Sequence, residues 1–384
     1  MDKGYFENLL GKIIATDTVS SEDPATDRSN SPLLDLLEQE AGALGGICRR
    51  QKVTAARNKE NLLIRLGPDL PGGLLLSGHT DTVPCDPELW HTDPFTLAED
   101  QMNYYGLGVI DMKGFFAHVL TAFREAYQAG DLKKPLHILA TADEETTMAG
   151  AAFFADHASI APEAVLIGEP TSLVPVFRHK GYMAYRVEVE GKTGHSSDPE
   201  AGLNAIGIVS GIITALTDLA EDLRKNFRDS SFRVDHPTLN LGSIRGGDAP
   251  NRICAHCELV LDMRPAGEAT PEVLDHLLRE RVALGAGEHR DRIRVTELYP
   301  PIPPFNGSAD NDLVIRTEKL SGRKASAVNY STEASYLSRL GVPAVVCGAG
   351  DIAHAHQADE KLPKKEIPEY RRILQDLIRE YCLR

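Results

Sequence analysis

The chain has 384 residues, of which 42% are hydrophobic and 25% charged, the balance of an ordinary globular protein. Its 41 Lys and Arg against 56 Asp and Glu give a formal net charge of −15 without a basic tract, which argues against nucleic acid as a partner. The length exceeds one ordinary core and predicts two domains of roughly 100–200 residues each.

The first twenty residues predict an amphipathic surface helix, because Phe6, Leu9, Leu10, Ile13 and Ile14 recur at helical spacing between charged residues. This stretch lacks the form of a signal peptide, and no apolar run approaches the roughly 20 residues that span a bilayer. We therefore expect a cytoplasmic protein without a membrane partner. The six cysteines are scattered through the chain, as expected for reduced thiols.

Two of these cysteines, Cys254 and Cys257, form a CxxC pair within "NRICAHCELVLDMRP". The alternation of this stretch predicts a strand, on which residues three apart point to opposite faces. The second Cys pair that structural zinc sites usually supply is also missing. We therefore expect no shared metal and no redox chemistry at this pair.

The first half of the chain predicts an α/β domain. Short apolar runs alternate with helical patterns: 72–81 a strand, 112–130 a helix, 136–145 a strand and 164–170 a third strand. Continuously apolar strands that alternate with helices indicate a parallel or mixed sheet covered by helices on both faces.

From about residue 181 the pattern changes to half-exposed strands and two long helices. The expected elements are strands within 181–197, 238–247, 251–265 and 292–305, and helices near 202–227 and 271–284. This fits a two-layer α+β domain. Beyond "YPPIPP" the first pattern resumes with a helix near 311–321, a strand at 343–351 and a helix from about 364. The predicted domains are therefore 1–180 and 300–384 together, with 181–299 inserted.

Acidic residues and histidines gather where the predicted strands of the first domain end. In open α/β sheets, ligands bind at the carboxyl ends of the strands. Asp111 lies in "GLGVIDMKG", just before the helix that packs on this sheet. The residues that follow the strand ends are His79, Asp81, Glu144, Glu145, Glu169, His354 and His356.

Such a set of carboxylates and imidazoles without thiolates suits Zn, Co or Mn, and an acid-rich set can hold two ions bridged by one carboxylate. We expect His79 to be a ligand and Asp81 to accept its other ring N–H. Each residue has an alternative reading: a polar strand end, a solvated turn at Glu144 and Glu145, or a helix cap at Asp111. Outside this context, the prediction for three further histidines is a surface or packing role: His91, His118 and His137.

The motifs "GHTDTVP", "GLGVIDMKG", "ADEE", "IGEPT", "GHSSDP" and "AHQADE", in this order, resemble those of the co-catalytic metal aminoacylase and carboxypeptidase superfamily. The resemblance covers nearly the whole chain. Longer stretches, such as "KKPLHILATADEETTMAGAAFFAD", are similar to the branch that releases acetate from N2-acetyl-L-ornithine in arginine biosynthesis. The resemblance implies a zinc-exopeptidase-like catalytic domain with an inserted lid domain, which also forms the contact between the two subunits of a homodimer.

Carried over residue by residue, the resemblance implies a bridging Asp111, with His79 and Glu169 on one zinc and Glu145 and His356 on the other. Cobalt is a possible substitute for the two Zn²⁺ of each subunit. Because "HQADE" departs from the family's usual His-Gln-Pro-Asp-Glu, His354 is the alternative ligand to His356. The remaining implied roles are the general base for Glu144, orientation of His79 for Asp81, and a reach into the partner's site for His195.

The substrate positions of the family correspond to Lys180, Asn251, Arg252 and Arg264, for which a surface salt bridge is the alternative reading. Glu333 in "YSTEA" is a candidate for the ornithine ammonium, although capping by Ser331 or Thr332 explains this segment equally well. The expected activity is metal-dependent hydrolysis of an N-acyl amino acid. Alternatives are a sibling deacylase for succinyl-diaminopimelate, acetylcitrulline or N-acyl amino acids in general, and a metal-binding protein without catalysis.

Overall fold

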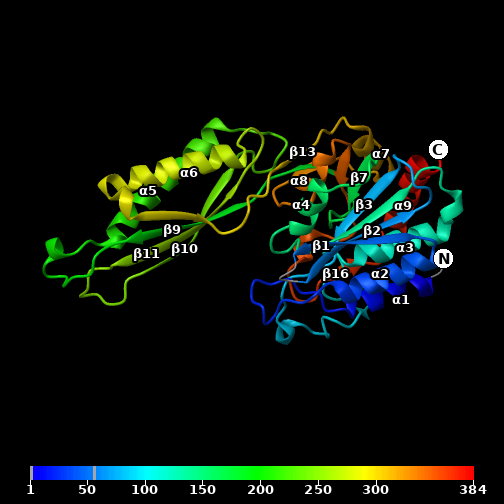
Figure 1. Ribbon diagram of the computed structural model, residues 1–384, viewed down its shortest axis with the longest axis horizontal. Helices are drawn as coiled ribbons and strands as arrows, with labels where there is room; N and C mark the ends of the chain where they lie inside the picture. The colour runs from blue at the N-terminus through cyan, green and yellow to red at the C-terminus, as the bar shows by residue number, and fades with distance from the viewer. Residues whose placement is uncertain (1–2, 55–57) are drawn as a thin grey trace. The chain divides into compact units, whose positions relative to one another are not determined.

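The computed structural model describes residues 3–54 and 58–384 and divides them into two compact units (Figure 1). The first unit comprises 1–177, 307–326 and 332–384, and the second comprises 178–306 and 327–331. The sequence analysis assigned 300–306 and 327–331 to the first domain. They belong to the second because Phe305 pairs with His179, and the Val328 carbonyl accepts the N–H of Lys180 at 3.4 Å.

The first unit contains a mixed sheet in the order β1-β2-β6-β3-β7-β15. Its strands are β1 (Ile47–Thr54), β2 (Lys59–Leu66), β3 (Leu74–His79), β6 (Leu136–Thr141), β7 (Ala164–Ile167) and β15 (Ala344–Val346). The four strands β6, β3, β7 and β15 are mutually parallel, and β1 and β2 add an antiparallel edge. The sequence analysis missed β1 and β2. The carboxyl ends of the parallel strands therefore meet at one edge of the sheet.

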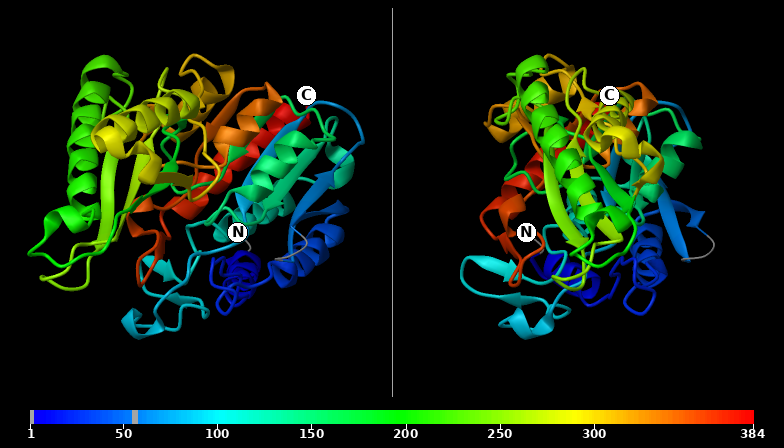
Figure 2. Two further views of the ribbon diagram at one scale, coloured as in Figure 1. Left: turned by 60° about the vertical axis from the view of Figure 1, so that its left-hand side comes forward. Right: turned by 90° about the vertical axis from the view of Figure 1, so that its left-hand side faces the viewer.

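Helices cover both faces of this sheet (Figure 2). One face carries α1 (Lys3–Ile14), α2 (Ser31–Ala43), α3 (Gly114–Ala126), α7 (Asp312–Ser321) and α9 (Glu366–Cys382), and the other carries α4 (Ala149–Asp156) and α8 (Ala334–Leu337). Every residue of β3 is buried. Leu74 and Leu76 join the core beneath α3 and α9, whereas Leu75 between them points to the opposite face. This two-sided burial explains why the strands read as continuous apolar runs.

A smaller sheet fastens two loops of the first unit together. It pairs β16 (Lys361–Pro363) with β5 (Asn103–Tyr105), which pairs in turn with β4 (Ala98–Glu99). The strands β8 (Val176–His179) and β14 (Ser326–Val328) lie at the boundaries between the units.

The second unit is a four-stranded antiparallel sheet with two helices on one face (Figure 1). Its strand order is β10 (Thr238–Gly246), β11 (His256–Arg264), β9 (Met183–Glu190) and β12 (Ile293–Glu297). The helices α5 (Ala205–Asn226) and α6 (Pro271–Ala286) pack on it, and β13 (Phe305–Asn306) completes the unit. Asn204 caps α5 and Thr270 caps α6 through hydrogen bonds to backbone N–H groups, as helix starts require. This is the two-layer α+β arrangement expected from the alternating strands.

The cysteine pair differs from its predicted geometry. Cys254 precedes β11 instead of lying on it, and both thiols are buried in the same core beneath α5. The Cys254 thiol donates to the His256 carbonyl at 3.0 Å. The opposite-face argument was therefore wrong, although both cysteines are free thiols. None of the helices described here is long and apolar enough to cross a membrane.

Candidate metal centre

Polar side chains converge where three neighbouring parallel strands of the first unit end. His79 is the last residue of β3, Glu144 and Glu145 follow β6, and Glu169 follows β7. Because the strand order is β6-β3-β7, these positions are adjacent at one edge of the sheet. Two loops complete the cluster, since Asp111 precedes α3 and His356 follows a short 3₁₀ turn.

Glycines precede two of these residues for a steric reason. A Cβ on Gly78 would lie 2.5 Å from Met112 Cε, and one on Gly168 would lie 2.1 Å from Phe115 Cδ2. Only glycine lets α3 approach the strand ends this closely. The dipeptides Gly78-His79 and Gly168-Glu169 thus place their polar side chains directly beside α3.

Asp111 is the centre of the cluster, because each of its two carboxylate oxygens meets a different histidine. Its Oδ1 lies 3.0 Å from His79 Nε2, and its Oδ2 lies 3.2 Å from His356 Nε2. On the first side, Glu169 Oε1 is 3.7 Å from His79 Nε2. On the second side, Glu145 Oε2 is 3.1 Å from His356 Nε2. The carboxylate of Asp111 therefore joins two sets of three side chains.

Each set has the composition of a divalent metal site. In each, one donor atom per residue lies within 4.8 Å of the others, and a third set of the same kind combines His79 and Glu145 with Glu144. The sets are His79, Asp111 and Glu169; Asp111, Glu145 and His356; and His79, Glu144 and Glu145. Imidazole and carboxylate donors without thiolate suit zinc or cobalt, and a metal ion fits between the histidine and the carboxylates of each set. The donor chemistry therefore fits the metal expected from the sequence.

The charges of the cluster perturb the pKa values of its members in opposite directions. Burial, with the charge of Asp111, raises the pKa of Glu169 well above its usual value, and burial raises that of Glu145 to about 6. Burial would raise the pKa of Asp111 too, but hydrogen bonds from His356 and His79 bring it well below the usual range. Hydrogen bonds to Asp111 and Glu145 raise the pKa of His356 to about 10. Opposed shifts of this kind in one cluster are typical of functional sites.

Glu144 lies beside the cluster with a different environment. Burial raises its pKa well above the usual value, and the negative charges of Glu169, Glu145 and Glu333 add to the shift against the opposing charge of His79. A carboxylate with a raised pKa can both accept and return a proton near neutral pH. This property suits the general base that the sequence resemblance implied.

Asp81 acts through different atoms from those predicted. The Nδ1–H of His79 donates to the backbone carbonyl of Asp81 at 3.0 Å, whereas the Asp81 carboxylate oxygen lies 3.7 Å away. The carboxylate instead accepts the backbone N–H groups of Glu144 at 3.2 Å and Glu145 at 3.1 Å. The prediction named the wrong acceptor, the carboxylate instead of the backbone carbonyl of Asp81. The carbonyl nevertheless keeps a proton on Nδ1 of His79, as the predicted contact would have done. With Nδ1 donating to this carbonyl, Nε2 is the ring nitrogen of His79 that faces Asp111.

The alternative readings of Glu144, Glu145 and Asp111 do not describe what the structure contains. Asp143 adopts a left-handed conformation with φ of +63°, and the Thr147 hydroxyl donates to its carboxylate at 2.6 Å. This turn, with the two hydrogen bonds to Asp81, fixes Glu144 and Glu145 instead of leaving them solvated. The residue at the N-cap of α3 is Lys113, so Asp111 does not cap that helix.

The structure also distinguishes His356 from His354. His356 adopts a left-handed conformation with φ of +58° and contacts Asp111 and Glu145. His354 ends the preceding 3₁₀ turn and belongs to none of the three donor sets of the described residues. The register with His356 is therefore the one in which the loop reaches the cluster.

Glu333 lies in the interior, beside the end of β6. Its side chain is fully buried, and the Thr141 hydroxyl donates to its Oε1. Burial raises the pKa of Glu333 to about 7. The capping alternative is met by Thr332, whose hydroxyl accepts the N–H of Ala334 at 3.2 Å. The contact of Glu333 with an ornithine ammonium stays a prediction.

Five candidates belong to the second unit and lie outside the metal cluster: Lys180, His195, Asn251, Arg252 and Arg264. His195 and Asn251 are exposed, and His195 Nδ1 lies 2.7 Å from the Ser197 hydroxyl. Arg252 forms a surface ion pair with Asp248, and Arg264 is 3.4 Å from Asp262, which matches the alternative reading of both.

Lys180 is buried in the second unit. Its ammonium donates to the carbonyl of His236 at 2.5 Å. Burial lowers the pKa of Lys180 to about 8. One of its three N–H donors is thus engaged within its own unit, and its role in binding the substrate carboxylate stays a prediction.

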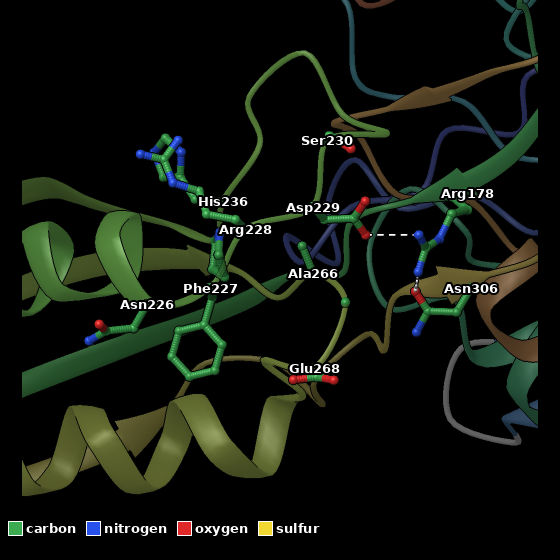
Figure 3. Close-up of a pocket in the computed structure, with 12 residues that line it drawn as sticks. Arg178, Asn226, Phe227, Arg228, Asp229, Ser230, His236, Ala266, Glu268 and Asn306 are labelled. Atoms are coloured by element: carbon green, nitrogen blue, oxygen red, sulfur yellow. Dashed lines mark hydrogen bonds and ion pairs between the residues drawn. The ribbon is translucent and has the colours of Figure 1, made fainter.

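The second unit also contains a cavity of about 620 Å³ (Figure 3). Arg178 projects into it and is held by Asp229 at 2.9 Å and by Asn306 at 3.3 Å. Glu268 and Phe227 line other parts of its wall. None of the described residues that line this cavity belongs to the metal cluster.

The three histidines outside the cluster have surface or packing positions in the described structure. His118 and His137 are buried, and His118 lies between the rings of Phe6 and Tyr370. His91 is exposed, and its Nδ1 lies 2.5 Å from Asp359. Sequence reasoning missed two other residues near the centre: Thr141, which bonds Glu333, and Glu360, which bonds the loop that carries Asp111. No spacing or periodicity distinguishes either residue.

Comparisons with known proteins agree with this geometry. The sequence profile of the peptidase family M20/M25/M40 matches residues 75–380. The chain is 45% identical over 377 residues to the acetylornithine deacetylase of Erwinia tasmaniensis, with 98% of each chain covered. It is 45% identical over 378 residues to that of Proteus mirabilis, covering 98% of this chain and 97% of the relative.

Among solved structures, an M20 family metallo-carboxypeptidase from Sulfolobus solfataricus aligns with a TM-score of 0.77 at 16% identity, over 98% of this chain and 99% of the other. A tripeptidase from Staphylococcus aureus aligns with a TM-score of 0.75 at 19% identity, over 99% of both chains. At these identities the structural matches show the fold alone.

Proposed function

The chain belongs to the peptidase family M20/M25/M40 and is a metal-dependent hydrolase, and from this premise we propose that it hydrolyses N2-acetyl-L-ornithine to L-ornithine and acetate. The observation that carries the chemistry is Asp111, whose two oxygens each meet a different histidine. The 45% identity to acetylornithine deacetylases along nearly the whole chain supports the choice of substrate. This reaction places the enzyme in arginine biosynthesis.

The metal ligands that we propose are His79 and Glu169 for one Zn²⁺ and Glu145 and His356 for the other, with Asp111 between them. Two such ions would polarise the amide carbonyl and lower the pKa of a water molecule from about 15.7 to about 7, with Co²⁺ as a possible substitute. The ring of His79 is held for this task by its hydrogen bond to the Asp81 carbonyl.

Glu144 is the general base in this proposal. Its raised pKa suits it to accept a proton from the attacking water and to return that proton to the leaving amine. The Asp81 carboxylate holds the N–H groups of Glu144 and Glu145, so the base and the adjacent ligand keep a fixed spacing along the turn. Such positioning contributes because small displacements of a catalytic group lower the rate strongly.

Acetate release from purified, metal-loaded enzyme tests this function. We expect acetylornithine to be hydrolysed faster than acetylcitrulline, acetylmethionine or succinyl-diaminopimelate. We expect Glu144→Gln to lose at least about 10²-fold in kcat, the usual contribution of a general base, while it still binds metal. Glu163→Gln is the matched control, since Glu163 is a surface carboxylate paired with Lys134 at 2.7 Å. A Glu144→Gln enzyme as active as this control would contradict the assignment.

The partner in the proposal is a second copy of the chain, bound through the second unit. The strand β10 is an edge of its sheet, spans nine residues and carries Arg245 as its one charged residue. Its side chains Leu241 and Ile244 are exposed, as is Ile206 on the neighbouring helix α5. The opposite edge, β12, is shorter and carries Arg294 and Glu297. A long edge strand with a single charged residue invites pairing, whereas the two charges on the shorter strand β12 disfavour it.

In such a dimer, His195 would act in the partner's site, and Asn251, Arg252 and Arg264 would contact the substrate carboxylate. Sedimentation velocity tests the pairing: Ile244→Glu should shift the enzyme toward the monomer. Ile47→Glu is its control, because Ile47 is an exposed isoleucine at the edge strand of the first unit. An Ile244→Glu enzyme that sediments as the parent does would contradict this interface. We also propose that the enzyme acts in the cytoplasm, because its six cysteines are free thiols, as is usual in a reducing compartment.

A further inference from the structure

Glu360 is a buried carboxylate whose hydrogen bonds all go to the loop that carries Asp111. Its Oε1 accepts the N–H of Ile110 at 2.8 Å and the N–H of Asp111 itself at 3.1 Å. Its Oε2 accepts the N–H of Gly108 at 2.8 Å. The side chain is only 2% exposed. Three amides of one short loop thus converge on a single carboxyl group inside the first unit.

The loop has the geometry that this convergence needs. Gly108 has a φ of +78°, and a Cβ there would lie 2.7 Å from Thr82 Cγ2 and 2.8 Å from Lys113 Cε. Successive N–H groups that turn toward one point form a concave anion-binding nest. A buried carboxylate is costly unless its oxygens are satisfied. In this structure the nest supplies three donors, and the buried Lys113 adds a positive charge that interacts with Glu360.

The same contacts connect the two loops that meet at the second metal set. Glu360 follows His356 by four residues in the chain, and its carboxylate bonds to the backbone of Asp111. The adjoining strand β16 pairs with β5, where Lys361 is opposite Tyr105. The spacing between His356 and the carboxylate of Asp111 therefore depends on where Glu360 holds the 108–111 loop.

We propose that Glu360 is a positioning residue that fixes Asp111 against His356 and so sets the metal affinity of the set Asp111, Glu145 and His356. This inference rests on the proposed function, in which that set holds one of the two metal ions. Glu360 itself touches neither metal donor atoms nor substrate. Its effect passes through the backbone amides of residues 108, 110 and 111.

Metal titration of the Glu360→Gln enzyme against a chromophoric chelator tests the proposal without an activity assay. The amide keeps the shape of the side chain, but its NH₂ group cannot accept an N–H, so the loop loses part of its anchor. We expect about 10–100-fold weaker binding of one of the two Zn²⁺ ions, the one that the proposal assigns to Asp111, Glu145 and His356, because this is the usual range for residues that support a ligand. In turnover at limiting zinc, the lost activity should return when zinc is raised, with KM for the substrate unchanged within about twofold, because substrate contacts are intact.

Glu318→Gln is the matched control, because Glu318 of the same unit also accepts a backbone N–H, from Ala325 at 2.7 Å. A purely structural role would lower the melting temperature of both variants and leave the zinc affinity of the folded protein within about twofold of the parent, and this result would overturn the proposal. If Glu360→Gln does not fold, Glu360→Asp replaces it, since this variant keeps the charge but withdraws it by one methylene group. Unchanged zinc affinity in Glu360→Asp would likewise overturn the proposal. A parent enzyme that binds zinc but releases no acetate would contradict the proposed function alone.

Discussion

We predict that the buried histidine His118 lowers the free energy of unfolding of the protein in acid. Its side chain lies on α3 between the rings of Phe6, at 4.9 Å, and Tyr370, at 5.2 Å. Neither ring nitrogen has a hydrogen-bond partner in the described structure. Burial, with the charge of Arg371, lowers the pKa of His118 to about 3. The imidazole is therefore neutral in the folded protein at any pH at which the enzyme works.

In the unfolded chain the same imidazole titrates at its ordinary value of about 6.5. Between the two pKa values the unfolded state binds the proton and the folded state does not, so the free energy of unfolding falls as the pH falls. His118 thus costs nothing above about pH 7.5, and its destabilising effect grows as the pH drops below about 6.5. From pH 8 to pH 5 the expected loss is about 2 kcal/mol from this one residue.

Urea unfolding of the parent and of His118→Phe at pH 8 and pH 5 measures this effect. Phenylalanine keeps an aromatic ring between Phe6 and Tyr370 but cannot be protonated. Any packing change is the same at both pH values. The two enzymes therefore differ in their loss of unfolding free energy between pH 8 and pH 5 only through the titration of His118. We expect the variant to lose about 2 kcal/mol less than the parent over this range. His157→Phe, at an exposed histidine, is the control. An equal loss in parent and His118→Phe would refute the reasoning.

Three further predictions concern the metal centre. Asp81→Asn should lower kcat about 10–100-fold at saturating zinc, because the turn at Glu144 and Glu145 loses one acceptor and a hydrogen bond to a charged group contributes about 1.5–3 kcal/mol. Initial rates measure this effect, and a rate within twofold of the parent would contradict it. His356→Ala should bind one equivalent of zinc less than His354→Ala by elemental analysis, and equal contents would reopen the register of that loop. Removal of metal with a chelator should lower the melting temperature, since free zinc at about 100 times its Kd stabilises the folded state by about 2.7 kcal/mol. Calorimetry with and without chelator measures this shift, and identical transitions would contradict a metal bound by the folded state.

Most of the fold could be predicted from periodicity. The runs Leu74–Leu76 and Ile138–Ala140 are continuously apolar because β3 and β6 are covered on both faces, and the alternating second unit has helices on one face only. The edge strand β1 and its neighbour β2 were missed. The sequence of β1 mixes charged and apolar residues, because this strand has one neighbour and lies partly exposed at the edge of the sheet. Periodicity is weakest where a strand has neither two neighbours nor two covered faces.

The metal cluster could be predicted because its residues follow parallel strands, whose carboxyl ends meet at one edge of the sheet. His79, Glu145 and Glu169 are related by this topology and not by distance along the chain. Roles that depend on the backbone of a single loop could not be predicted in this way. The contact of His79 with a carbonyl instead of a carboxylate, and the nest that surrounds Glu360, depend on φ and ψ angles that no residue pattern specifies.

Our proposal of two ions, and not one, follows from the charges of the site's acids. The carboxylates of Asp81, Glu333 and Glu360 accept hydrogen bonds from backbone amides or a hydroxyl. The others, Asp111, Glu144, Glu145 and Glu169, face one another and the two histidines. When ionised, these four carry a charge of −4, whereas one dication with neutral histidines would leave −2 in a partly buried cluster. Like charges at such spacing raise each other's pKa and disfavour ionisation. Two dications supply +4, which balances the four carboxylates while both imidazoles remain neutral and free to bind metal.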